Sequence, residues 1–244
     1  MIGLYDRLVE YHPKTMDPVP SLATHWEQNS DGTVYTFYMR KEGKFSNGDP
    51  IKATDMVWSI KRALSPALAS RYAFLGYDIR YGEAYNANKS FVKNKDGRFF
   101  LESDFAEKHE SDTAGDSAQP ASGEAAGELS EYQKFINGPM RLTVPSDEKG
   151  KAAFIKSNPK MSAVYDGTEL VPVTADDIGI EAVDDYTVRF KLRQSAPYFV
   201  GLLTHQFFSA LHRQTIEKFD TDWIKPENIV TSGAFKVSVW KPYD

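Results

Sequence analysis

The fold of this chain is decided by residues 37–64, which read FYMRKEGKFSNGDPIKATDMVWSIKRAL. The segment starts as a strand, reverses at residues 46–50, where Gly48 supplies a positive φ, and continues as a helix. Thr54 or Asp55 is expected to cap this helix, because either side chain can accept from the first N–H groups. Apolar residues three and four positions apart then give the helix one buried face: Val57, Ile60 and Leu64.

The strands around this segment are predicted from alternating apolar residues. Residues 34–39 alternate as a half-buried strand after a turn at 29–33, and with Trp26 before the turn they form a hairpin. Residues 174–192 form two further strands around Asp184 and Asp185. These adjacent carboxylates point apart on a tight turn, so they are not a catalytic pair, whose members must face one substrate.

Composition restricts the class of protein. The 244 residues are 41% hydrophobic, carry a net charge of -5 and include no cysteine. The length allows one large core or two modest ones. The excess of acids argues against a nucleic-acid surface, and the lack of cysteine excludes disulfides and thiolate metal sites. No apolar run approaches the roughly eighteen residues of a membrane span. Residues 1–11 do not read as a signal peptide, so we expect the natural start to lie before Met1.

Residues 102–131 differ from the rest of the chain. They are rich in acids, Ser, Gly and Ala and contain almost no bulky apolar residue. Such a segment buries too little surface to offset its ordering entropy, so we expect a solvated excursion and not a second domain. Its acids lack the register of a calcium loop, and no metal site is predicted there.

The histidines are interpreted as structural. His25 has no second histidine or carboxylate at ligand spacing. His205 and His212 are too far apart for one helical metal pair, and the sequence places no nucleophile near either. The sequence therefore predicts no catalytic residue, no metal and no cofactor.

The order of residues within 37–64 resembles a known family pattern. The pattern F-x-L-R-x-x-x-K-F-x-x-G-x-P-x-x-A-x-D-V-x-x-S-x-x-R, here with Met39 for the Leu and Met56-Val57 after Asp55, is similar to the characteristic segment of the family 5 extracellular solute-binding proteins. These are the peptide-, dipeptide- and nickel-binding receptors of ABC importers. Weaker resemblance covers most of residues 2–90 and 162–242, and it implies a short helical turn at the P-x-L-A-x-x-W element that ends at Trp26.

The resemblance implies a mixed α/β fold of the type II periplasmic-binding-protein-like class. Residues 1–244 would form most of lobe 1, with a mixed sheet, flanking helices and the hairpin at 26–39 in a small antiparallel subdomain, and the second lobe would be absent. Phe235 is expected to begin a buried alternating strand that runs to Val239.

Two elements resemble parts of the family's ligand cleft. Tyr72 matches the tyrosine of an S-x-Y-A-x-x-L stretch, and its ring can cover an apolar side chain while its hydroxyl finds a polar partner. The second element is a loop that resembles the family's P-V-G-T/N-G-P/A-Y segment. It consists of Thr231, Ser232, Gly233 and Ala234, and Gly233 is expected to permit close approach of another backbone.

The implied function is capture of a peptide outside the cytoplasmic membrane and its delivery to the permease subunits of an ABC importer, by closure of two lobes. The protein would be a monomer, periplasmic or anchored at the outer face of the membrane, and would catalyse no reaction. A nickel chelate or an oligosaccharide stays open as the ligand, and so does an isolated lobe that binds nothing detectably. An α/β hydrolase would need a nucleophile, a base and an oxyanion donor together, and the sequence offers no such set.

Overall fold

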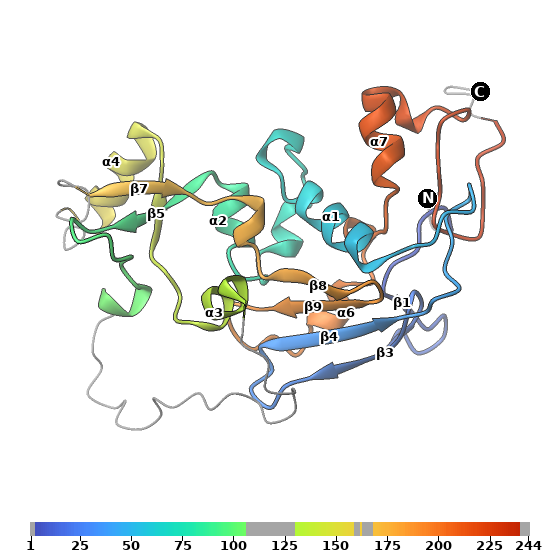
Figure 1. Cartoon of the computed structure of the whole chain (residues 1–244), viewed down its shortest axis with the longest axis horizontal. Helices are drawn as coiled ribbons and strands as arrows, with labels where there is room; N and C mark the ends of the chain where they lie inside the picture. Colours follow the sequence, from blue (N-terminus) through green and yellow to red (C-terminus); the bar gives the residue numbers. More distant parts are fainter. Residues whose placement is uncertain (1–2, 106–129, 159–161, 163–167, 240–244) are drawn as a thin grey trace. The chain divides into compact units, whose positions relative to one another are not determined.

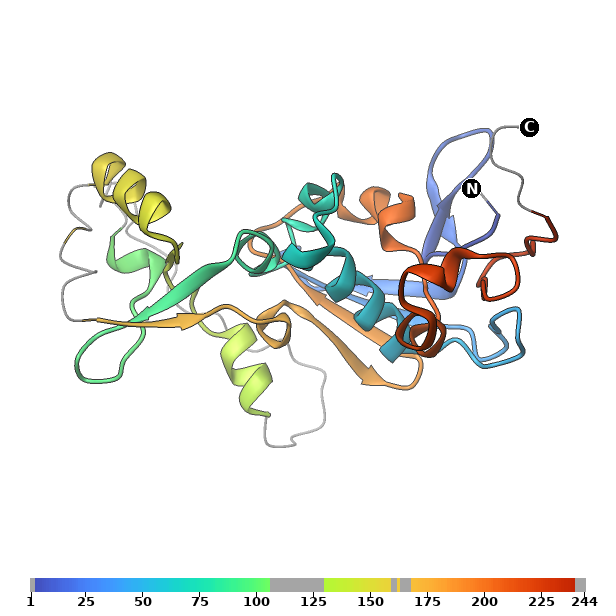
Figure 2. The same cartoon turned by 90° about the horizontal axis from the view of Figure 1, so that it is seen from above.

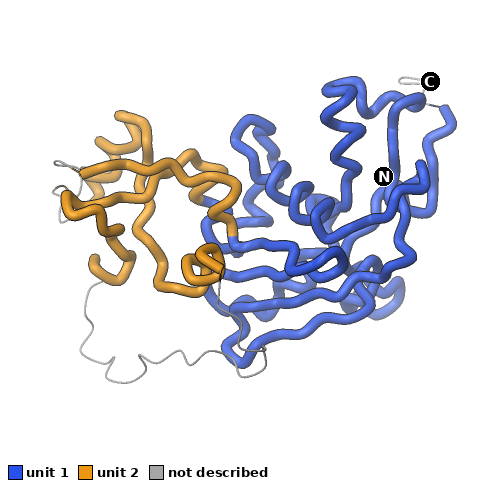
Figure 3. The backbone as a smooth tube through the Cα atoms, viewed as in Figure 1, with its two compact units in different colours: residues 1–83, 179–244 blue, residues 84–178 orange. Residues whose placement is uncertain are grey.

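The computed structural model describes residues 3–105, 130–158, 162 and 168–239 (Figure 1). The chain divides into two compact units: unit 1 comprises residues 1–83 and 179–244, and unit 2 comprises residues 84–178 (Figure 3). The sequence did not predict this subdivision. Most of the polar excursion expected at 102–131 lies outside the described residues. The assignment of residues 1–244 to a single lobe stays a prediction.

Unit 1 is built mainly from strands and short helices. Its strands are β1 (Val9–Tyr11), β2 (Pro18–Pro20), β3 (Ala23–Gln28), β4 (Val34–Met39), β8 (Ile180–Asp184) and β9 (Thr187–Lys191). Its α-helices are α1 (Ala53–Ala63), α6 (Phe199–Leu202) and α7 (Arg213–Phe219), and its 3₁₀ turns are η1 (Pro66–Leu68), η2 (Ala73–Gly76), η6 (Gln206–Phe208) and η7 (Asp220–Ile224). The short α2 (Gly82–Asn86) crosses the boundary between the units.

The centre of unit 1 is a four-stranded sheet in the order β3-β4-β9-β8. Tyr35 and Phe37 of β4 stand opposite Phe190 and Val188 of β9, and all four side chains are buried. Phe199 of α6 packs its ring 5.3 Å from those of both Tyr35 and Phe190. The strands predicted at 34–39 and within 174–192 are therefore confirmed, and the hairpin β3–β4 belongs to this sheet. The strand pairs among the described residues are antiparallel, so the mixed sheet that the resemblance implied is not seen there.

Helix α1 begins two or three residues earlier than the caps expected from the sequence, Thr54 or Asp55, would place it. Lys52 occupies the N-cap position, and its backbone N–H donates to Asp55 Oδ2 at 2.8 Å. The Ala53 N–H donates to the carbonyl of Asp185 in the β8–β9 turn, which fixes the start of the helix. Asp55 therefore supports the cap from inside the first turn, and neither Thr54 nor Asp55 is the N-cap residue.

The buried face of α1 joins the core of unit 1. Ile60 and Leu64 are fully buried, as predicted, but Met56 and not Val57 completes the buried stripe, because Val57 is only half-buried. The helix packs against β8 and β9 and lies along them in two perpendicular views (Figures 1 and 2).

Two local predictions are wrong. The helical turn expected before Trp26 is instead part of strand β3, which pairs with β4. The strand expected at 235–239 is not formed: the segment has no regular secondary structure, and Phe235 and Val239 are 66% and 67% exposed. The reason is the same in both places, because backbone pairing with a partner strand, and not the local apolar pattern, decides whether a strand forms.

Backbone hydrogen bonds join the two segments of unit 1 at the point where the chain leaves for unit 2 and returns from it. The Arg80 N–H donates to the Lys191 carbonyl at 2.9 Å, and the Gly179 N–H donates to the Arg80 carbonyl at 2.9 Å. The Lys191 N–H in turn donates to the Gly179 carbonyl at 2.8 Å. Arg80 and Gly179 are therefore neighbours in the structure, although residues 81–178 lie between them in the sequence.

Unit 2 has a three-stranded sheet of its own in the order β6-β5-β7. Its elements are β5 (Lys89–Lys93), η3 (Glu102–Asp104), α3 (Glu131–Asn137), β6 (Thr143–Pro145), α4 (Glu148–Ser157), β7 (Glu169–Pro172) and η5 (Ala175–Asp177). Val92, Leu142 and Val144 form its buried core. The Arg141 guanidinium lies 3.8 Å from the Phe99 ring centre and 4.3 Å from that of Phe135, a cation–π arrangement.

Candidate functional site

Tyr72 presents an exposed aromatic ring on unit 1. It precedes η2, and its side chain is 49% exposed. The ring centre lies 5.1 Å from that of His205, with the two planes tilted by 47°. The Tyr72 ring thus lies against His205 and leaves about half of the residue open to solvent; a role in covering an apolar group of a ligand stays a prediction.

The loop Thr231–Ala234 is held by its own hydroxyl groups. Ser232 Oγ donates to the Ala210 carbonyl at 2.8 Å and accepts from the Asp6 N–H at 3.0 Å. Thr231 Oγ1 donates to the Phe235 carbonyl at 2.9 Å. Both side chains are buried, at 1% exposure for Thr231 and 4% for Ser232. The Ser232 hydroxyl therefore ties the loop to two distant segments, and the Thr231 hydroxyl holds the bend of the loop itself.

Gly233 and Ala234 differ from their two neighbours. The Gly233 N–H donates to the Leu4 carbonyl at 2.9 Å. A Cβ at Gly233 would lie 2.8 Å from the Leu4 carbonyl carbon and would also collide with the carbonyl oxygen of Gly3. The close backbone approach predicted for Gly233 is therefore confirmed. Ala234 is exposed, so within this loop it is the residue open to solvent.

A single segment of unit 1 connects the two elements predicted from the sequence. Tyr72 rests on His205, and Ser232 bonds to Ala210, five residues farther along the same segment. His205 accepts from the Phe207 N–H through Nδ1 and so begins η6. The structure brings Tyr72 and the loop Thr231–Ala234 to this shared support. Whether they touch a ligand stays a prediction.

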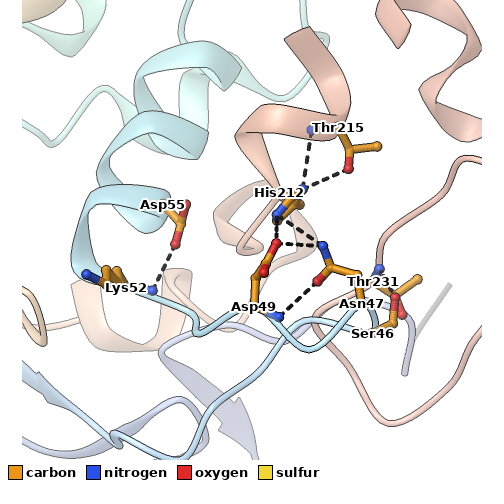
Figure 4. Close-up of polar contacts among 8 residues, drawn as sticks. All are labelled: Ser46, Asn47, Asp49, Lys52, Asp55, His212, Thr215 and Thr231. Atoms are coloured by element: carbon orange, nitrogen blue, oxygen red, sulfur yellow. Dashed lines mark hydrogen bonds and ion pairs between the residues drawn. The ribbon is translucent and has the colours of Figure 1, made fainter. Parts of the chain in front are cut away.

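The turn at residues 46–50 is anchored beside the same loop (Figure 4). The Ser46 N–H donates to the Thr231 carbonyl at 2.8 Å, and the Thr231 N–H donates to Ser46 Oγ at 3.0 Å. Asn47 Nδ2 donates to Asp49 Oδ2 at 2.6 Å, and Asp49 in turn lies 2.9 Å from His212 Nε2. The turn that the sequence marked as decisive is thus tied to both the loop and helix α7.

Asp49, His212 and Thr215 form a hydrogen-bonded chain in the order acid, imidazole, hydroxyl. His212 Nδ1 lies 2.7 Å from Thr215 Oγ1, and the Thr215 N–H also points at Nδ1, at 3.3 Å. Because Nδ1 accepts from a backbone amide, the ring proton is assigned to Nε2, which faces Asp49. Thr215 is buried and is the third residue of α7, so this geometry is an N-terminal helix cap.

The structural interpretation of His212 is confirmed by this cap, and Figure 4 shows the imidazole between the turn and the helix. Sequence reasoning did not identify the cap. The spacing His212-x-x-Thr215 could have signalled it, because a side-chain acceptor three residues before a polar residue is a capping pattern.

Burial raises the pKa of three ionisable side chains near the site. Burial raises the pKa of Asp55, although the Lys52 N–H bond opposes that rise. Burial, followed by the negative charge of Glu10, raises the pKa of Asp6, whose backbone N–H meets Ser232. Burial also raises the pKa of Tyr5 to about 12, and its buried hydroxyl has no hydrogen-bond partner among the described residues.

The residues that the structure describes include neither a metal-binding cluster nor a membrane-spanning helix. In these parts of the chain no three His, Asp or Glu side chains are grouped so that they could hold a metal ion. No helix that the structure describes has both the length and the apolar character needed to span a membrane.

Solved structures establish the fold. Haemophilus influenzae OppA in complex with RPPGFSPFR matches with a TM-score of 0.61 and 23% identity, over 98% of this chain and 31% of that one. The substrate-binding domain of an oligopeptide ABC transporter from Bacillus anthracis str. Ames matches with a TM-score of 0.60 and 22% identity, over 98% of this chain and 30% of that one. The fold expected from the sequence, that of part of a type II periplasmic binding protein, is confirmed.

Sequence comparisons give the family. The oligopeptide-binding protein OppA of Bacillus subtilis (strain 168) is 41% identical over 227 residues, which are 92% of this chain and 26% of that protein. The periplasmic OppA of Escherichia coli (strain K12) is 27% identical over 223 residues, 91% of this chain and 26% of that protein. This chain therefore spans about a quarter of the length of each. Residues 17–244 match the family model described as bacterial extracellular solute-binding proteins, family 5 Middle. The chain belongs to family 5 of the bacterial extracellular solute-binding proteins.

Proposed function

We propose that this chain is part of the substrate-binding protein of an ABC importer, and that the complete protein captures peptides outside the cytoplasmic membrane. The observation that carries the proposal is the family match over residues 17–244. Relatives named for oligopeptide and dipeptide binding support peptides as the ligand class. The H. influenzae neighbour, solved with RPPGFSPFR, supports the same class.

The proposed mechanism is closure of two lobes around the peptide. A ligand shifts a protein toward a closed state only through contacts that are better in that state. This chain would supply one side of those contacts through the exposed ring of Tyr72 and through Ala234 at the exposed end of the loop. Thr231, Ser232 and Gly233 would act by positioning the loop, because their hydroxyls and backbone are engaged within unit 1.

The proposal includes no chemical reaction. The chain of Asp49, His212 and Thr215 caps a helix, and the Thr215 hydroxyl is buried, so it is not placed to attack a substrate. A turnover assay with chromogenic esters tests this point. Hydrolysis that disappears in a His212→Ala variant would favour a hydrolase instead.

The cellular context follows from the same proposal. The protein would work as a monomer in the periplasm or anchored at the outer face of the membrane, and would hand its ligand to the permease subunits of the importer. Relatives named as periplasmic binding proteins support this location.

The decisive experiment identifies what the complete protein carries. The protein is purified without added ligand and denatured, and the released molecules are identified by mass spectrometry. A mixture of peptides is the expected result. A single oligosaccharide or nickel chelate would overturn the peptide assignment, and so would a bile acid, because one relative is named a probable deoxycholate-binding protein.

A pair of variants then tests the role of Tyr72. Tyr72→Ala is expected to release the bound peptides, because it removes the exposed ring. Phe74→Ala is the matched control: Phe74 is also an exposed aromatic residue, at 59%, two positions along the same segment. Equal peptide retention by both variants would remove Tyr72 from the site.

A further inference from the structure

The chain contains two Asn-Gly pairs, Asn47-Gly48 and Asn137-Gly138. In such a pair the glycine nitrogen can attack the side-chain amide carbon of the asparagine, because glycine has no Cβ to obstruct the approach. The dipeptide alone does not distinguish the two pairs. The structure places them in different surroundings.

The side chain of Asn47 is folded back along the turn at residues 46–50. The Asp49 N–H donates to Asn47 Oδ1 at 3.1 Å, which is the hydrogen bond of an Asx turn. Asp49 also accepts at Oδ2 from Asn47 Nδ2 at 2.6 Å, and Figure 4 shows both contacts. Asp49 therefore holds both ends of the Asn47 amide, next to Gly48, the residue between them.

The same contacts suit the charge that such an attack develops. Attack on the amide carbon moves negative charge onto Asn47 Oδ1, and the Asp49 N–H already donates to that atom. A donor placed where charge develops lowers the barrier without further reorganisation. Gly48 is exposed, and a Cβ built on it would meet no atom within 4 Å, so solvent reaches the attacking nitrogen.

The second pair cannot have the same donor. The residue two positions after Asn137 is Pro139, which has no N–H, so no equivalent of the Asp49 hydrogen bond can form there. Asn137 is also the last residue of α3, so its backbone continues the helix and does not bend into an Asx turn.

The attacking nitrogen is also held differently in the two pairs. The Gly138 N–H closes α3 by donating to the carbonyls of Lys134 at 3.1 Å and Phe135 at 3.3 Å. The Gly48 N–H donates to the Phe45 carbonyl at 2.9 Å within an exposed turn. Hydrogen bonds in exposed turns open more readily than those that close a helix packed in a fold.

We propose that Asn47 is a self-modification site, at which the folded protein converts this asparagine to aspartate or isoaspartate and releases ammonia. The Gly48 nitrogen gives its proton to a base in solvent and bonds to Asn47 Cγ. The bond from Cγ to Nδ2 then breaks, Nδ2 takes a proton from water and leaves as ammonia, and a cyclic imide remains. Water opens the imide at either carbonyl carbon. The reaction is independent of the proposed function.

The product changes the anchor of the loop Thr231–Ala234. A carboxylate at position 47 would face the Asp49 carboxylate across the 2.6 Å contact that Nδ2 makes, and like charges at that distance repel. Isoaspartate also lengthens the backbone of the turn by a methylene group. Ser46, the preceding residue, shares hydrogen bonds of 2.8 and 3.0 Å with Thr231. The modified turn therefore holds the loop less firmly.

The test follows both pairs in one sample of the 244-residue chain. The chain is incubated at neutral pH, either folded or in guanidinium chloride, and digested at low pH, and the deamidated peptides are quantified by mass spectrometry. The ratio of the Asn47 rate to the Asn137 rate is expected to be roughly fivefold higher in the folded chain, which corresponds to about 1 kcal/mol, the net value of one hydrogen bond. A ratio that is unchanged or lower in the folded chain would overturn the proposal.

The variant Asp49→Ala tests whether Asp49 prepares the amide for reaction. It removes the acceptor of Asn47 Nδ2, and it leaves the contact of His212 with Thr215 that caps α7. The Asn47 rate of the folded chain is expected to fall relative to that of Asn137, with no such fall in guanidinium chloride. A folded variant that reacts at Asn47 as fast as the wild type would refute the role of Asp49.

Hydrogen exchange at the Thr231 amide tests the effect on the loop. Asn47→Asp reproduces the charge of the product and is expected to speed this exchange several-fold. Asn137→Asp, the matched control in unit 2, is expected to leave the exchange unchanged. Equal exchange at Thr231 in the wild type and both variants would refute the loosening of the loop.

Discussion

Ser232 offers the sharpest test of how the loop Thr231–Ala234 is held. Replacing Ser232 with Ala removes a hydroxyl that bridges two backbone groups, the Ala210 carbonyl and the Asp6 N–H. Ala210 is fully buried and Ser232 is 4% exposed, so water does not readily replace the lost partner. Both backbone groups would then be left without a hydrogen bond.

The expected loss of stability follows from the number of backbone groups that lose their hydrogen bond. Each buried polar group left unsatisfied costs about 1–3 kcal/mol. With two such groups, one of them partly relieved by relaxation of the loop, the free energy of unfolding of unit 1 should fall by about 2–4 kcal/mol. This is a large part of the roughly 5–15 kcal/mol that stabilises a typical domain.

Urea unfolding followed by tryptophan fluorescence measures this loss. Trp26, Trp58 and Trp223 belong to the described part of unit 1, and unit 2 has no tryptophan in its sequence, so the signal does not report on unit 2. Ser232→Ala should lower the urea midpoint without changing the slope of the transition. Ser238→Ala, at an exposed position, is the control and should change stability by less than about 0.5 kcal/mol.

A Ser232→Ala variant as stable as Ser238→Ala would refute the bridging role. If that stable variant also lost peptide binding, Ser232 would be a ligand contact and not a positioning residue.

Three further substitutions test other parts of unit 1. His212→Ala removes the cap of α7 and should lower the free energy of unfolding by about 0.5–2 kcal/mol, with a smaller loss for His212→Asn, as measured by urea unfolding. Gly233→Ala should destabilise by about 1–3 kcal/mol because its Cβ meets the Leu4 backbone, whereas Gly201→Ala, where a Cβ has open space in a helix, should be neutral or stabilising in the same assay. The pKa of Tyr5 rises from 10.0 to about 12 in the folded state, so the unfolded chain loses this proton first and stability falls as pH rises from about 10 to 12. Tyr5→Phe should remove that part of the fall, and parallel losses in the variant and the wild type would contradict the assignment.

The elements that the sequence predicted well are encoded within a few residues. Strand β4 alternates buried and half-buried side chains along its whole length. The β8–β9 hairpin turns where Asp184 accepts from the Tyr186 N–H and from Thr187 Oγ1, a local pattern visible in the sequence. Helix α1 follows a turn of Asn, Gly, Asp and Pro that leaves the chain few alternatives. In each case the sequence pattern that identifies the element lies within a few neighbouring residues.

The elements that the sequence missed depend on what pairs with them or covers them. Strand β3 is mostly exposed, so it has no alternation to recognise, and it exists because β4 offers a row of backbone hydrogen-bonding groups. The 235–239 segment has the alternation, but in the structure Phe235 and Val239 are not covered. An apolar pattern shows which face could be buried and does not show what buries it.

The candidate site was predicted only in outline for the same reason. The resemblance identified the loop Thr231–Ala234, but the partners of the Ser232 hydroxyl lie 22 and 226 positions away in the chain. Such roles become visible only when the fold brings the segments together.

The contact among Arg80, Gly179 and Lys191 has a consequence for how this protein can change. These backbone hydrogen bonds hold the two segments of unit 1 together. The number of residues between Arg80 and Gly179 therefore does not affect the register of β8 against β9. Insertions and deletions can therefore accumulate in unit 2 without disturbing the larger sheet. Homologues can differ widely in this module, and a protein engineer has a defined point at which to graft another one.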